Sequence, residues 1–142
     1  MNRILMLALG GALGTLARYV VNGLVSARLG GLGALTAVFP LGTVVVNVSG
    51  CLVIGLLAAV AEPSLGRAWL RPEWRDFLLI GLCGGYTTFS SYALQTLNLA
   101  RDAEWMWAFL NVAASNVLCL AAVFLGRAAG LLLQARFHGG AL

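Results

Sequence analysis

The residues best suited to chemistry lie in the uncharged stretch 77–100. Gly84 and Gly85 are followed there by Thr87 and Thr88, a composition that favours a break in a membrane helix. A break at membrane depth exposes backbone groups, which protein or a water-filled cavity must receive. Freed carbonyls coordinate cations such as Na⁺, and half-helix N-termini attract anions. The stretch therefore predicts an ion-binding broken helix. The alternative is a Gly-rich packing face whose hydroxyls bond back to their own helix.

Other kinds of site find little support. His138 is the single histidine, and no nucleophile and base are paired, so we do not expect an enzyme. Cys51, Cys83 and Cys119 lack metal-type spacing and are interpreted as small packing residues. Nucleic acid is excluded as a partner, because no basic cluster is interleaved with aromatic residues.

Composition indicates the elements that position these residues. The chain has 142 residues, of which 61% are hydrophobic and 10% charged. A soluble domain carries about 25% charged residues, so lipid is the expected surrounding. At roughly 20 apolar residues per spanning helix, residues 1–142 form one all-α, integral membrane domain, with the third of four spans broken near its middle. The approximate spans are 4–27, 38–61, 76–100 and 105–130.

The first segment, the polar interval between the second and third spans and the small residues each allow a further prediction. Arg3 and the apolar run after it also resemble a secretory signal, although apolar sequence continues past Arg18. The polar interval 62–76 predicts an interfacial loop anchored by Trp69 and Trp74. Small residues at helical spacing predict close helix contacts. These are Gly10, Gly14, Gly42, Gly50, Gly55, Gly126 and Gly130.

Three motifs carry a resemblance to a known family. Residues 10–19 read GGALGTLARY, residues 42–50 read GTVVVNVSG and residues 81–90 read GLCGGYTTFS. In this order they resemble the fluoride channels of the Fluc (CrcB) family, and the resemblance covers roughly residues 4–130. It implies a multi-pass protein of the plasma membrane, the inner membrane of a bacterium, that passively exports fluoride and so lowers cytoplasmic fluoride. It also implies an antiparallel, dual-topology dimer with a structural Na⁺ at the dimer interface.

The resemblance assigns roles to individual residues. The backbone carbonyls of Gly84 and Thr87 match the family's Na⁺ ligands. Tyr92 replaces the second of two pore phenylalanines, and Gln95 stands where many members have a carboxylate. A phenol keeps the positive ring edge that meets an anion and adds an O–H donor. The expected ion pathway consists of Thr43, Asn47, Thr88, Phe89, Tyr92 and Ser115, with Asn111 one turn before Ser115.

Each polar residue also has a simpler structural interpretation. Asn47 lies one helical turn after Thr43 and is the best donor candidate for a desolvated fluoride; the alternative is that it joins two helices by a hydrogen bond without contacting the ion. The same alternative applies to Asn111 and Ser115. Arg18 either attracts anions at a pore vestibule or anchors its helix near the membrane surface.

Two other functional classes have similar dimensions. A small four-helix multidrug antiporter needs a carboxylate within the membrane, and none of Glu62, Glu73, Asp76, Asp102 and Glu104 is expected in the interior of a span, since Asp76 stands at the boundary of the third. A scaffold subunit without transport would use the break for packing alone.

If the chain is a channel, its arginines do not decide which subunit it pairs with. Six of them are expected on one side of the membrane, namely Arg3, Arg67, Arg71, Arg75, Arg127 and Arg136, and Arg28 and Arg101 on the other. This bias favours one orientation, with the termini in the cytoplasm, whereas dual insertion of a single chain needs a weaker bias. Either the acids of the middle loop and the helix ends blunt the bias, which gives the homodimer that we expect, or the chain pairs with an oppositely oriented homologue.

Overall fold

The computed structural model describes residues 2–29, 38–62 and 70–138, and the regular structure in these ranges is entirely helical. Within the described residues, four stretches are long and apolar enough to cross a membrane, which confirms the predicted all-α fold with four spans. The third stretch, Pro72–Arg101, combines four of the helices below. The helices are α1 (Arg3–Leu29), α3 (Leu41–Val60), α4 (Pro72–Asp76), the π-helix η1 (Phe77–Cys83), α5 (Gly84–Tyr86), α6 (Phe89–Arg101) and α7 (Trp105–His138).

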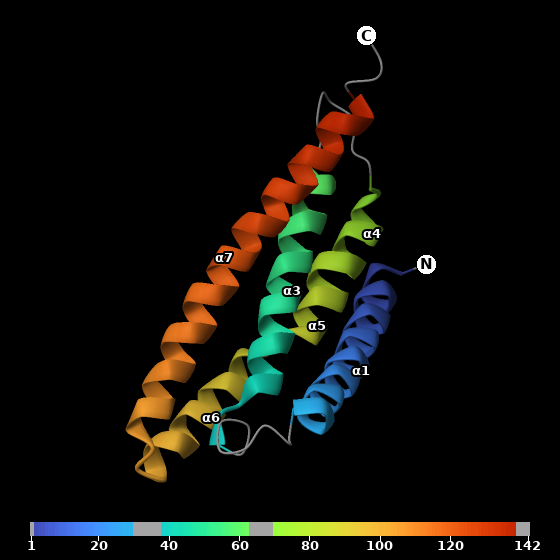
Figure 1. Cartoon of the computed structure of the whole chain (residues 1–142). Coiled ribbons are helices and arrows are strands. Elements are labelled where there is room, and N and C mark those ends of the chain that lie inside the picture. Colours follow the sequence, from blue (N-terminus) through green and yellow to red (C-terminus); the bar gives the residue numbers. More distant parts are fainter. Residues whose placement is uncertain (1, 30–37, 63–69, 139–142) are drawn as a thin grey trace.

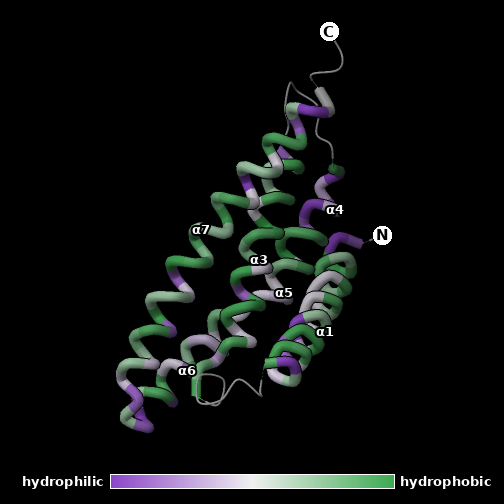
Figure 2. The backbone as a smooth tube through the Cα atoms, viewed as in Figure 1, coloured by the Kyte–Doolittle hydropathy of each residue, from purple (hydrophilic) through white to green (hydrophobic). Residues whose placement is uncertain are grey.

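The helices form an elongated bundle around α3 (Figure 1). Its most extensive contact is with α7, which runs along one side of it. On the other side, α1 packs against η1 and α5, while α6 turns away from α5 and packs on α7. Hydrophobic residues dominate the middle of the bundle, and hydrophilic residues gather near α4 and at the turn between α6 and α7 (Figure 2). This distribution fits a lipid environment.

Glycines allow the backbones of neighbouring helices to approach closely. A Cβ added to Gly10 would lie 2.7 Å from the Phe77 carbonyl oxygen, and one added to Gly130 would lie 2.7 Å from the Leu56 carbonyl oxygen. Side chains larger than hydrogen do not fit at these two crossings, α1 with η1 and α7 with α3. The predicted role of the small residues in helix contacts is therefore confirmed at both places.

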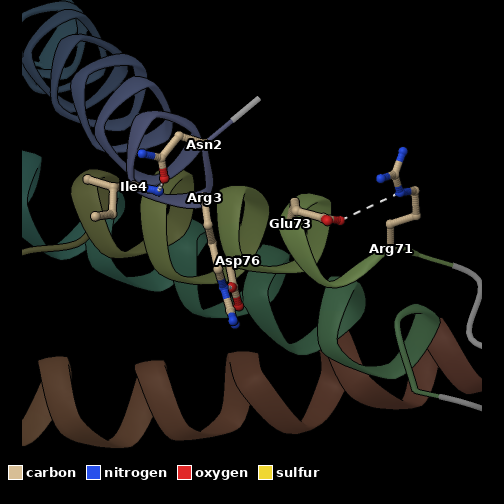
Figure 3. A network of polar contacts seen from close by, with 6 residues as sticks. All are labelled: Asn2, Arg3, Ile4, Arg71, Glu73 and Asp76. Carbon is tan, nitrogen blue, oxygen red and sulfur yellow. Dashed lines mark hydrogen bonds and ion pairs between the residues drawn. The ribbon is translucent and has the colours of Figure 1, made fainter.

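An ion pair joins the start of α1 to the start of the third span (Figure 3). The Arg3 guanidinium donates to the Asp76 carboxylate, whose side chain is only 8% exposed. Glu73, one turn earlier, pairs with Arg71 at 3.6 Å. Both acids were expected in an interfacial loop, but α4 places them in the first turns of the third span. Trp74 lies in α4 as well, whereas Trp69 lies outside the described residues.

Candidate functional site

The third span breaks at two residues. Thr87 (φ −78°, ψ 155°) and Thr88 (φ −147°, ψ 113°) are extended, and α6 starts directly after them. Thr88 caps this new helix, because its side-chain oxygen accepts a hydrogen bond from the Ser91 N–H at 3.2 Å. The predicted break is therefore confirmed, and it leaves α6 with its own N-terminus beside α3.

The glycine pair does not itself form the break. Gly84 and Gly85 are helical and belong to α5. A Cβ on Gly85 would lie 2.6 Å from the Gly11 carbonyl oxygen, so this glycine serves the contact with α1. The break falls two residues later, where other groups take over the backbone hydrogen bonds.

Asn47 holds the broken segment in place. Its Oδ1 accepts a hydrogen bond from the Thr88 N–H at 2.7 Å, and its Nδ2 donates to the Thr88 carbonyl at 3.0 Å. Both residues are buried, with 9% of Asn47 and 8% of Thr88 exposed. Because an amide nitrogen carries two protons, one N–H of Asn47 remains for a further acceptor.

The break also releases backbone carbonyls, among them those of Gly84 and Thr87. In a continuous helix the Thr88 N–H would donate to the Gly84 carbonyl, and the Ser91 N–H would donate to that of Thr87. The first donates instead to Asn47, and the second to the Thr88 hydroxyl. Gly84 is moreover exposed on the bundle surface. Free carbonyl oxygens are ligands that suit a hard cation, so the chemistry of these two groups fits Na⁺.

One cavity of about 320 Å³ gathers most of the predicted pathway. It lies where α3, the break, α6 and α7 meet, and we call it the groove. Its lining includes the predicted residues Asn47, Thr87, Thr88, Phe89, Tyr92 and Ser115, together with Cys51, Ile54, Asn116, Cys119 and Leu120.

Phe89 and Tyr92 form the aromatic wall of the groove. Their ring centroids lie 5.2 Å apart with the planes tilted by 57°. Phe89 is 77% exposed, a high value for an apolar ring. The Tyr92 hydroxyl accepts a hydrogen bond from Asn116 Nδ2 at 3.2 Å, which leaves its own proton free to donate. The two rings and the Tyr92 hydroxyl thus line one wall of the groove.

A chain of polar contacts supports the groove from α7. Ser115 donates to Asn111 Oδ1 at 3.3 Å, and Asn111 Nδ2 donates to Thr96 at 2.8 Å. Thr96 in turn donates to the Tyr92 carbonyl at 2.9 Å. Asn111 is only 1% exposed and links α7 to α6 rather than lining the groove. Sequence reasoning missed Thr96, although its position one turn after Tyr92 placed it on the same helical face.

Thr43 and Gln95 meet in a different cavity. This second space, of about 360 Å³, also contains Asn22 and Ser26 and lies between α1 and the start of α3. Thr43 is buried there, and Gln95 Oε1 has no hydrogen-bond partner in the described part of the chain. Thr43 therefore does not join Asn47 in the groove.

Arg18 is half-buried on α1 and lines neither of these cavities. Its predicted vestibule role stays a prediction.

Comparison with known proteins gives consistent matches. The model of the family described as CrcB-like protein, Camphor Resistance (CrcB), matches residues 5–127. A fluoride-specific ion channel FluC of Rhodospirillum rubrum is 46% identical over 92% of this chain and 95% of the relative. Channels of the same name from Opitutus terrae and Paracoccus denitrificans are 47% and 48% identical, over 92% and 91% of this chain and 94% of each relative.

Proposed function

Because the chain belongs to the CrcB family, we propose that fluoride crosses the membrane through the groove lined by Asn47, Phe89 and Tyr92. The chain is a fluoride-specific ion channel, a multi-pass protein of the plasma membrane. The observation that carries the pathway is the meeting of one amide and two aromatic rings in a single cavity beside the helix break.

The groove supplies what a desolvated fluoride requires. Fluoride is small and strongly hydrated, so it enters only where donors replace its water. The remaining N–H of Asn47 and the hydroxyl proton of Tyr92 are two such donors. Ser115 is a third, but its proton bonds to Asn111, so it serves fluoride only after giving up that bond. The rings of Phe89 and Tyr92 have positive edges, which suit contact with an anion.

We infer passive flow without a chemical step. No acidic side chain lines the groove in the described part of the chain, so the groove contains no carboxylate for proton coupling. Gln95 is neutral and lies in the second cavity. External HF enters a cell and dissociates at the higher internal pH, and the negative membrane potential then drives fluoride outward. This flow lowers cytoplasmic fluoride and confers resistance.

We further propose an antiparallel homodimer with a Na⁺ at its interface. The Gly84 and Thr87 carbonyls of both copies would hold the ion, which supplies a positive charge that fixes the two broken helices against each other. The exposed position of Gly84 and the release of these carbonyls support this assignment.

A liposome assay tests the function. Purified protein is reconstituted into liposomes loaded with KF or KCl, and valinomycin carries K⁺ so that anion flow is not limited by charge. We expect rapid fluoride release and little chloride release. Fluoride release no faster than from empty liposomes would contradict the proposal and favour a scaffold role.

A further inference from the structure

The three cysteines occupy two different environments. Cys83 is buried, with 3% exposed, near the packing of η1 against α1. Cys51 of α3 and Cys119 of α7 are half-buried and line the groove. A Cβ added to Gly55, four residues after Cys51, would meet the carbonyl oxygen of Val123, four residues after Cys119, so the register of α3 against α7 places these two thiols beside each other as a pair. The interpretation of all three as plain packing residues does not account for this pair.

The pair sits directly beside the proposed ion pathway. Cys51 follows Asn47 by four residues on α3, and Cys119 follows Ser115 by four residues on α7. Residues four apart share a helical face, so the thiols lie one turn, about 5.4 Å, beyond the polar groups. An ion bound between the thiols would therefore occupy the groove next to Asn47.

The backbones of α3 and α7 approach each other closely just beyond the pair. A Cβ on Gly55, one turn after Cys51, would lie 3.1 Å from the Arg127 nitrogen. A Cβ on Gly126 would lie 3.0 Å from the Leu52 carbonyl carbon. Both contacts lie on the same side of the pair, toward the C-terminal ends of α3 and α7, and they fix the register that sets Cys51 beside Cys119.

We propose that Cys51 and Cys119 form a two-thiolate site for a soft metal ion that coordinates two sulfurs in line, such as Hg²⁺, and that its occupation blocks fluoride flow. Thiolate ligands select soft metals, and the thiolate rather than the thiol is the metal ligand. One Hg²⁺ replaces the protons of two thiols, forming two S–Hg bonds and releasing two protons to water. The product carries no net charge, which suits a groove with apolar neighbours Ile54 and Leu120.

The expected block of fluoride flow rests on the proposed pathway. Binding of the metal ion by the two thiols does not depend on that pathway. Cys83→Ala provides the background for testing it, because the chain has 3 cysteines and this variant keeps only the pair. In this background we expect one Hg²⁺ per chain to consume both thiols, as measured by titrating free thiols after loading. We also expect loading to slow fluoride release from liposomes by at least about tenfold.

Single-thiol controls separate paired from single binding. Cys51→Ala and Cys119→Ala, each combined with Cys83→Ala, also bind mercury, but through one sulfur. Excess glutathione, a monothiol, should remove mercury from these variants and should fail to remove it from the paired site, where a dithiol succeeds. Two Hg²⁺ per chain in the paired variant, or equal removal by glutathione from all variants, would overturn the two-thiolate site.

Fluoride release is measured in the same protein before and after mercury is added. Fluoride release before mercury is added reports the proposed function alone, so a failed channel assay is recognised without reference to the thiols. If untreated protein releases fluoride and the fully loaded pair releases it equally fast, the site exists but does not block the pathway, and that part of the proposal is wrong.

Discussion

Asn47 and Thr88 are 41 residues apart in sequence, yet the side-chain amide of the first bonds both backbone groups of the second. The pairing replaces the helical hydrogen bond that Thr88 gives up at the break. It also fixes the orientation of the amide, so that the remaining N–H has a defined direction. Asn47 thus supports the break and supplies a donor with the same side chain.

Asn47→Asp should slow fluoride release by at least about tenfold, equivalent to about 1.4 kcal/mol. A carboxylate has no proton to donate to the Thr88 carbonyl, and its charge repels both that oxygen and the anion. Liposome flux measures the effect, and size-exclusion chromatography reports assembly. Asn98→Asp is the matched control, because Asn98 is exposed on α6 and lines neither cavity. Wild-type flux in Asn47→Asp would remove Asn47 from the pathway.

The sequence anticipated the location of the break but not its construction. Gly84 and Gly85, followed by two threonines, predicted a break within one helical turn of its actual position, because glycine and threonine are poorly suited to a lipid-facing span. Both lie in α5, where Gly85 contacts α1, a contact that no local pattern encodes. The two hydrogen bonds to Asn47 are likewise a long-range contact.

Helical spacing correctly predicted which residues share a face of one helix, but it did not predict which residues line the same cavity. Asn47 and Thr43 are one turn apart on α3, but they face different partners, because α6 leaves the direction of α5 at the break. Phe89 and Tyr92 did share a face, since both belong to α6. The pairing of Cys51 with Cys119 depended on the register between α3 and α7, which the sequence alone did not specify.

Phe89→Ile should reduce fluoride release by at least about tenfold while leaving the protein assembled. Isoleucine keeps apolar volume but lacks the positive ring edge. The matched control is Phe124→Ile, because Phe124 of α7 is 71% exposed, a value close to the 77% of Phe89, and is not part of the groove. Equal flux in the two variants would show that the exposed ring of Phe89 meets lipid rather than the ion.

Gly126→Ala should destabilise the bundle by roughly 1–3 kcal/mol, the usual cost of overpacking. The added methyl group would meet the backbone of Leu52, which cannot turn aside as a side chain could. Thermal unfolding in detergent measures this loss. Gly23→Ala on α1 is the control, because a Cβ there has nothing within 4 Å. If both variants melt at the wild-type temperature, the contact of α7 with α3 is looser than the glycine geometry requires.

Removal of Na⁺ should separate the proposed dimer and slow fluoride release, because the Gly84 and Thr87 carbonyls of two copies would then face each other without a cation. The measurement replaces Na⁺ by a large organic cation, with size-exclusion chromatography and liposome flux as independent readouts. Thr87→Ser should retain the Na⁺ response, since the ligand is a backbone carbonyl and serine keeps the hydroxyl that bonds the Cys83 carbonyl at 2.9 Å. A dimer that stays intact and conducts equally well without Na⁺ would show that the released carbonyls serve another purpose.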